Sequence, residues 1–173
     1  MNIENSVYSK VKKRTRSADK LPFICNANIG ELEVSYKYTS SIKERPEIHE
    51  PSEAIMVLKK LFNENTICLQ EQFSIIYMNY ANRVIGTFSE FKGSFNASIV
   101  DLKLIVATAV KIMASRIIIA HNHPSGNIKP SDSDKKLTTK LKEGLKLLDI
   151  ELVDHIILSP DGNYISFANE CLI

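Results

Sequence analysis

The sequence predicts an α/β (α+β) fold, in which helices cover a mixed β-sheet. Apolar strands alternate with amphipathic helices along the chain, which is typical of this class. One short segment, 116–120, is so apolar and β-branched that it predicts a central strand covered on both faces. The composition, 44% hydrophobic and 24% charged, is that of an ordinary globular protein. With 173 residues, the chain has room for one domain at 29–173, preceded by a basic arm at 1–28.

The first half of that domain is predicted to contain a strand, a helix and a hairpin. Alternating polar and apolar residues at 31–38 indicate a half-buried edge strand, and a polar loop follows at 40–50. Pro51 then opens a helix. The apolar face of this helix is expected to consist of Ile55, Leu58, Leu61 and Phe62.

A hairpin is predicted next, with strands at 66–78 and 83–88 and a turn at 79–82. Residues 91–96 are expected to form a loop. A long helix follows, with Asp101 as its N-cap. The spacing of its apolar residues predicts a buried face made of Ile105, Ala109, Ile112 and Met113.

The second half of the domain alternates strand and helix. After the central strand at 116–120, Ser131 is expected to begin another helix. Its buried face is predicted to contain Leu137, Leu141, Leu145 and Leu148. A strand at 151–158, a turn at 159–162 and a closing strand at 164–167 complete the expected sheet.

Charge and cysteine content exclude several classes of protein. A net charge of +2 is too small for a chain coated with nucleic acid as a whole. Three widely spaced cysteines without a Cys-x-x-Cys pair argue against a disulfide framework and against a thiolate zinc site. The sequence has no apolar run of the roughly 18–20 residues that a membrane span needs, and no secretory signal is evident. We therefore expect a cytoplasmic protein without membrane contact.

An excess of positive charge lies in the arm at 1–28, which is expected to be flexible. Such an arm can make weak, non-specific contacts with nucleic-acid phosphates, although a solvated tail is the more common explanation. The residues concerned are Lys10, Lys12, Lys13, Arg14 and Arg16.

The segment 121–134, His-Asn-His-Pro-Ser-Gly-Asn-Ile-Lys-Pro-Ser-Asp-Ser-Asp, carries the strongest chemical signal. His121 and His123 are two apart in extended backbone, so both point to one side, at the carboxyl end of the central strand. Asp134, in the first turn of the next helix, could face both imidazoles. Two imidazoles and one carboxylate are a normal zinc set that leaves the fourth position for water, which zinc activates near neutral pH.

A purely structural interpretation exists for the same residues. Ser131-x-x-Asp134 is also a capping box, and an acidic residue is stabilised at the positive end of a helix. For a bare His-x-His with a nearby Asp this interpretation would prevail. The coincidence of all these residues in one strand, loop and helix start favours the metal site. His155, beside Asp154 in a strand, is interpreted as a hydrogen-bonded structural residue rather than a fourth ligand.

The pattern His-x-His-Pro, six residues, Ser, two residues, Asp matches the JAMM motif of the JAB/MPN metalloprotease superfamily. The string His-Asn-His-Pro-Ser-Gly closely resembles the RadC family within it, and the likeness covers roughly residues 50–170. A short stand-alone form is most similar, because the chain shows no Gly-rich helix-hairpin-helix pattern in its first fifty residues. The resemblance implies a JAB/MPN-like fold with a cytidine-deaminase-like architecture.

The resemblance also implies roles for individual residues. His121, His123 and Asp134 are the implied ligands of one Zn²⁺ per chain. Ser131 is implied to help stabilise the oxyanion of the transition state, and Glu71 to act as general base. From spacing alone, Glu71 is as readily a surface residue. Glu64 and Glu90 are less attractive because loop signals surround them.

Three functions remain open at this stage. The first is a zinc-dependent metallohydrolase that cleaves peptide or isopeptide amide bonds. The second is a DNA-associated accessory protein, suggested by the basic arm and by the DNA-repair name of the family. The third is a non-catalytic MPN scaffold, although a scaffold has no need of an open metal position. A zinc nucleoside deaminase is excluded, because its His-x-Glu and Pro-Cys-x-x-Cys motifs are absent. The sequence predicts neither the physiological substrate nor the oligomeric state.

Overall fold

A mixed sheet of five strands, in the order β2-β1-β3-β4-β5, is the framework of the part that the structure describes. This structure is a computed structural model, and it describes residues 41–92 and 100–173. β1 pairs in antiparallel fashion with β2 and β3, β3 and β4 are parallel, and β5 returns antiparallel to β4. The strands are β1 Gln72–Met78, β2 Val84–Lys92, β3 Arg116–Asn122, β4 Glu151–Leu158 and β5 Tyr164–Ser166. The predicted fold class is confirmed, with β3 at the centre of the sheet.

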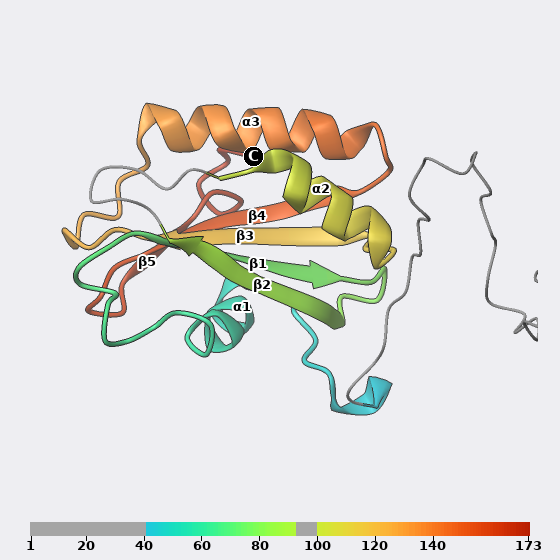
Figure 1. The fold of residues 1–173 in the computed structure, drawn as a ribbon, viewed down its shortest axis with the longest axis horizontal. Helices are drawn as coiled ribbons and strands as arrows, with labels where there is room; N and C mark the ends of the chain where they lie inside the picture. The colour runs from blue at the N-terminus through green and yellow to red at the C-terminus, as the bar shows by residue number, and fades with distance from the viewer. Residues whose placement is uncertain (1–40, 93–99) are drawn as a thin grey trace, which may run out of the picture. The chain divides into compact units, whose positions relative to one another are not determined.

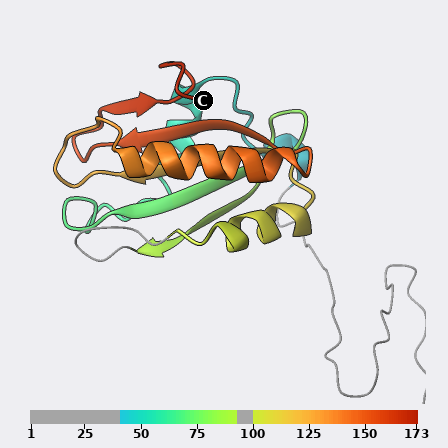
Figure 2. The ribbon, with the colours of Figure 1, turned by 90° about the horizontal axis from the view of Figure 1, so that it is seen from above.

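Helices cover both faces of the sheet (Figure 1 and Figure 2). α2 and α3 lie over one face, and α1 lies under the other. The described helices are η2 Ile42–Glu44, α1 Pro51–Leu58, α2 Leu102–Lys111 and α3 Asp132–Lys146. None of the helices within the described ranges is long and apolar enough to cross a bilayer.

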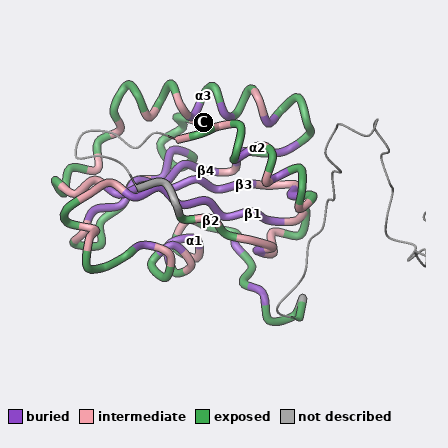
Figure 3. Tube along the Cα trace, viewed as in Figure 1, coloured by how far each residue is buried: buried purple, intermediate pink, exposed green. Residues whose placement is uncertain are grey.

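The alternation of side chains along each strand creates two separate apolar layers. In β3, Ile118 and Ala120 pack with α1, whereas Ile117 and Ile119 pack with α2 and α3. Burial along the central strands is continuous, as Figure 3 shows. β3 is buried from Ile117 to Asn122. The predicted central strand is therefore confirmed, and it runs two residues further than expected, through His121 and Asn122.

The parallel pairing of β3 and β4 determines where the chemistry of the chain can lie. Parallel neighbours need a crossover connection, and α3 is the helix of that connection. Because α3 runs back along the sheet, its first turn lies beside the carboxyl end of β3. Residues 121–134 therefore form one continuous strand end, loop and helix start.

Most predicted elements are confirmed, but the hairpin strands differ in their limits. β1 begins at Gln72 rather than at residue 66, because residues 64–70 form turns. The amide of Leu69 donates to the carbonyl of Thr66 at 2.9 Å, and the Gln72 side chain bonds to Asn63 and Thr66. β2 extends to Lys92, so the first part of the expected loop is strand. The strand predicted at 31–38 and the basic arm at 1–28 lie outside the described residues.

Two residues predicted from helical spacing to be buried are exposed, and the ends of the helices explain why. Met113 and Leu148, expected in buried faces, are 81% and 46% exposed. α2 ends at Lys111, and Met113 then has φ 55°, in the left-handed region. The amide of Met113 donates to the carbonyl of Val110, and that of Ala114 to Ala109, which is a Schellman motif. α3 ends in the same way around Asp149, with φ 54°.

Met113→Gly is expected to stabilise the protein. A non-glycine residue in the left-handed region costs about 1–2 kcal/mol, and the greater freedom of glycine in the unfolded chain offsets about 0.4–1 kcal/mol of that gain. The net increase in unfolding free energy is about 0.5–1 kcal/mol, measurable by urea denaturation. Met113→Ala is the matched control, because it removes the same exposed side chain without relieving the backbone. Equal effects of the two substitutions would contradict this account of the helix end.

Candidate metal centre

His121 lies near the end of β3 and is buried, with only 4% of its surface exposed. Its backbone is level with Phe73 of β1 on one side and with Ile157 of β4 on the other. The imidazole stacks on the Phe73 ring, with 6.2 Å between the ring centroids and 11° between the planes. The ring is therefore placed by regular sheet geometry and not by a loop.

His123 is positioned by a tight turn just beyond β3. Its amide donates to the carbonyl of Leu158 at the end of β4, and its own carbonyl accepts from the amide of Gly126. Pro124 occupies the second position of this turn, which it favours, and Gly126 has φ +80°. The turn brings the carbonyl of Asn127 to 2.6 Å from His123 Nδ1. Because a carbonyl only accepts, Nδ1 carries a hydrogen, so Nε2 is the ring nitrogen available to a metal.

Asp134 takes part in a capping box and also faces the imidazoles. Ser131 is the N-cap of α3, and its hydroxyl accepts from the Asp134 amide. The Ser131 amide and hydroxyl both donate to Asp134 Oδ2, at 2.8 and 2.6 Å. Oδ1 of the same carboxylate lies 3.3 Å from His121 Nε2. The two interpretations of this segment are therefore compatible, since the cap orients the carboxylate whose other oxygen points at His121.

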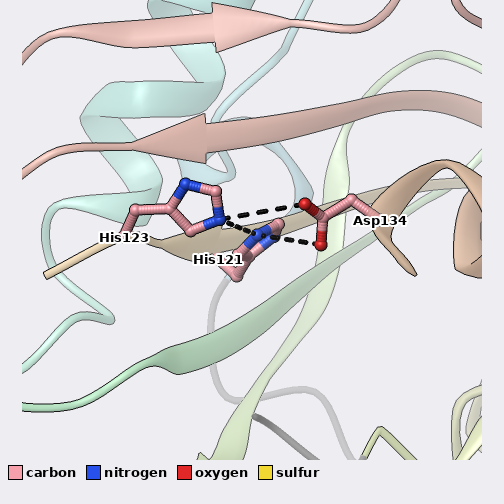
Figure 4. A group of neighbouring side chains, drawn as sticks. All are labelled: His121, His123 and Asp134. Carbon is pink, nitrogen blue, oxygen red and sulfur yellow. Dashed lines mark hydrogen bonds and ion pairs between the residues drawn. The ribbon is translucent and has the colours of Figure 1, made fainter. Parts of the chain in front are cut away.

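Three potential ligand atoms converge at this point, one each from His121, His123 and Asp134 (Figure 4). The Nε2 atoms of the two histidines are 3.0 Å apart, and Asp134 Oδ2 lies 3.8 Å from His123 Nε2. Ligands bound tetrahedrally at about 2.0–2.1 Å are roughly 3.3–3.4 Å from one another. The spacing and the two-nitrogen, one-oxygen donor set fit a zinc ion. The sheet, the turn and the cap place these residues.

His155 of β4 lies behind His121 and is fully buried. Its Nε2 is 2.9 Å from His121 Nδ1, and its Nδ1 is 2.6 Å from the hydroxyl of Thr138 in α3. The His155 ring also packs on Phe167 at 4.5 Å between centroids. His155 is thus hydrogen-bonded within the core and stands apart from the three converging atoms. Neither Thr138 nor its contact with His155 is evident from the sequence, because the two residues lie on different elements.

Burial keeps the inner histidines neutral. Desolvation lowers the pKa of His121 to about 4, and the negative charge of Asp134 opposes part of that shift. Desolvation also lowers the pKa of His155 well below its ordinary value, and the neighbouring His121 and His123 add to the decrease. Neutral imidazoles are the form in which histidine binds a metal.

The structure brings Ser131 and Asp134 together with the two histidines, but Glu71 is not hydrogen-bonded to any of them. Glu71 is half-buried and immediately precedes β1. Within the described residues, its carboxylate makes no hydrogen bond or ion pair. The antiparallel register pairs Phe73 with His121. Continued by two residues, backward from Phe73 and forward from His121, this register would bring Glu71 level with His123. Its predicted role as general base remains a prediction, as does the role of Ser131.

Asn122 is a further residue of the centre whose role the sequence analysis did not recognise. It lies between the two histidines and is fully buried, with its side chain on the face of the sheet opposite to His121. Its Oδ1 accepts from the Gln72 amide at 2.7 Å, and its Nδ2 donates to the carbonyls of Ile67 and Gln70. Asn122 therefore fixes the turn that leads to Glu71. The sequence signal that could have identified Asn122 is a polar residue at a buried position of an otherwise apolar strand.

Comparison with known proteins agrees with this geometry. Residues 48–172 match the RadC-like JAB domain, and this match covers more than half of the chain. The chain belongs to the RadC-like JAB domain family. The match includes every residue of the candidate centre, from Glu71 to His155. The resemblance to the RadC family that the sequence indicated is therefore confirmed.

Relatives of this RadC-like chain are bacterial proteins named UPF0758. One from Enterococcus faecalis is 42% identical over 114 residues, 66% of this chain and 49% of that protein. One from Clostridium botulinum is 37% identical over 134 residues, 78% and 57% of the two chains. One from Aquifex aeolicus is 38% identical over 139 residues, 80% and 58% of the two chains. The chain thus spans 49–58% of the length of these relatives.

The metal-free protein is expected to lose stability as the pH falls from 7 to 5. The pKa values of His121 and His155 are lowered in the folded state, whereas unfolded histidine titrates near 6.5. Below that pH the unfolded chain binds protons that the folded chain does not, at a cost of about 1.4 kcal/mol per pH unit for each histidine. Urea denaturation in the presence of a chelator measures this slope.

His155→Phe serves as the control for that measurement, because it removes one of the two titrating rings from the same apolar surroundings. The slope of stability against pH should fall by about half, whatever the stability of the variant at pH 7. A wild-type stability that stays constant between pH 7 and pH 5 would show that these rings are not held neutral.

Proposed function

We propose that this chain is a zinc-dependent metallohydrolase that cleaves the amide bond of a peptide or isopeptide substrate. Membership of the RadC-like JAB family and a group of residues that could hold a metal ion support the proposal. His121, His123 and Asp134 would hold one zinc ion. When bound, zinc would activate a water molecule and polarise the carbonyl of the substrate.

One observation carries the proposal. His121, His123 and Asp134 each offer one donor atom, these atoms all lie within 4.8 Å of one another, and each residue has another polar atom that is already bonded to protein. His123 Nδ1 bonds to a carbonyl, His121 Nδ1 to His155, and Asp134 Oδ2 to Ser131. Three protein ligands also leave a coordination position open, as catalytic zinc sites require and structural sites do not.

Glu71 is the proposed proton carrier. A carboxylate beside the open position can take a proton from the attacking water and deliver it to the leaving amine. The continuation of the β1–β3 register toward His123 supports this placement. Asn122 and Gln72 would hold the backbone that presents Glu71, through the bonds between them and the turn at 63–70.

Ser131 is proposed to donate a hydrogen bond to the developing oxyanion. Its hydroxyl donates to Asp134 Oδ2 in this structure, at 2.6 Å. The Ser131 amide donates to the same oxygen, at 2.8 Å. The hydroxyl could therefore turn toward a substrate while the carboxylate keeps one of its two donors.

Purified protein is expected to bind about one zinc ion per chain. His123→Ala should abolish this binding, because two ligands rarely hold zinc tightly. His49→Ala is the matched control, because His49 is exposed and lies before α1, away from the three converging atoms. Elemental analysis after dialysis and titration with a zinc-responsive chelator measure both quantities. Full zinc content in His123→Ala would contradict the ligand assignment.

Glu71→Gln is expected to retain zinc but to lower turnover by about 10²–10⁴-fold, the usual contribution of a general base. Turnover is measured as the release of a quenched fluorophore from a panel of peptide-linked and isopeptide-linked substrates. Glu64→Gln is the control, because Glu64 is exposed in the preceding turn. A zinc-loaded wild-type chain that cleaves none of these amides, and that behaves like Glu71→Gln, would favour a scaffold over an enzyme.

A further inference from the structure

Thr138 and His155 form a chain of hydrogen bonds that ends on His121. Thr138 lies one helical turn after Asp134 in α3 and is 2% exposed. Its hydroxyl oxygen lies 2.6 Å from two atoms, the carbonyl oxygen of Asp134 and Nδ1 of His155. His155 Nε2 in turn lies 2.9 Å from His121 Nδ1. Three hydrogen bonds in sequence thus connect the backbone carbonyl of one proposed ligand to the ring of another.

The direction of these hydrogen bonds follows from the carbonyl at one end. A hydroxyl has a single hydrogen, and a carbonyl oxygen can only accept. At 2.6 Å from the Asp134 carbonyl, the Thr138 hydroxyl must donate to that oxygen, which is the usual bond of a threonine to the helical residue four positions before it. The hydroxyl therefore accepts from His155, so the hydrogen of that ring lies on Nδ1.

The tautomer of His155 then determines that of His121. Both rings are buried among Phe73, Phe167 and the core, where a neutral imidazole is favoured. A neutral His155 with its hydrogen on Nδ1 has a lone pair on Nε2, so it must accept from His121 Nδ1. His121 consequently presents the lone pair of Nε2 to His123 and Asp134.

We infer that Thr138 and His155 are positioning residues that fix His121 in the tautomer able to bind a metal, an inference that rests on the proposed function. If the donor and acceptor of each of these hydrogen bonds were exchanged, His121 would carry its hydrogen on Nε2. That hydrogen would point at the Nε2 atom of His123, 3.0 Å away, and would occupy the space between the ligand atoms.

The two ligand histidines are fixed in different ways. His123 donates directly to a loop carbonyl, that of Asn127. His121 has no such carbonyl among the described residues and reaches one only through His155 and Thr138. That carbonyl belongs to Asp134, the third proposed ligand. The first turns of α3 thus supply a carboxylate to the group and also set the tautomer of its most buried member.

Thr138→Val and Thr138→Ser form a matched pair for the test. Valine has the shape of threonine without the hydroxyl, and serine keeps the hydroxyl without the methyl group. In Thr138→Val, a hydrogen on His155 Nδ1 would be buried without a partner, which is costly. The hydrogen of His155 should therefore move to its Nε2 atom. His155 would then donate to His121 Nδ1, and His121 would carry its own hydrogen on Nε2, where it blocks metal binding.

Long-range ¹H–¹⁵N spectra of histidine-labelled protein report the tautomers directly. In metal-free wild-type protein and in Thr138→Ser, His155 and His121 should both carry hydrogen on Nδ1. In Thr138→Val, His155 should shift toward Nε2–H. Zinc affinity, from competition with a fluorescent chelator, should fall about 10–100-fold in Thr138→Val and be retained in Thr138→Ser.

Wild-type spectra in which His155 carries its hydrogen on Nε2 would overturn the inference, and they require no variant to fold. Unchanged tautomers and unchanged zinc affinity in a folded Thr138→Val would overturn it as well. A wild-type chain with the expected tautomers but without zinc affinity would instead overturn the proposed function. The tautomer spectra therefore separate the two hypotheses.

Discussion

His121 Nδ1 is hydrogen-bonded to His155 inside the core, and the arrangement of the centre depends on this bond. Nδ1 faces His155 at 2.9 Å, and Nε2 faces His123 at 3.0 Å. A buried N–H group without an acceptor is costly, so His155 must be placed accurately behind His121. The sheet does this with β3 at its centre, β4 parallel beside it and α3 returning above both. The position of His121 is therefore determined by the core of the protein.

The strand alternation within β3 gives the two successive residues His121 and Asn122 different tasks. His121 points to the face covered by α3 and joins the proposed ligands. Asn122 points to the opposite face, where its amide holds Ile67, Gln70 and Gln72. One step along the strand thus links the three converging residues to the segment that contains Glu71.

Local signals in the sequence were sufficient for most of the fold and for the three converging residues. The Ser131 cap, the apolar strand before His121 and the spacing of the two histidines each depend on a few neighbouring residues, and each is found in the structure. Predictions failed where a helix ended without glycine. Met113 and Asp149 adopt the left-handed conformation at a steric cost, and no residue pattern predicts that conformation there. The Thr138–His155 contact could not be predicted from the sequence either, because it joins a helix to a strand through tertiary packing.

A bulge in β4 determines which face His155 occupies. Ile117 is level with Leu152, but Ile118 is level with Asp154, so Val153 is the extra residue. Without that residue, His155 would be level with Ala120 and would point toward α1, since a shift of one residue exchanges the faces of a strand. With it, His155 is level with Ile119 and points toward Thr138, while Asp154 turns to the other face and bonds to Ser166. Simple alternation along 151–158 gives the opposite assignment, so the placement of His155 behind His121 depends on one irregularity in the pairing of the two central parallel strands.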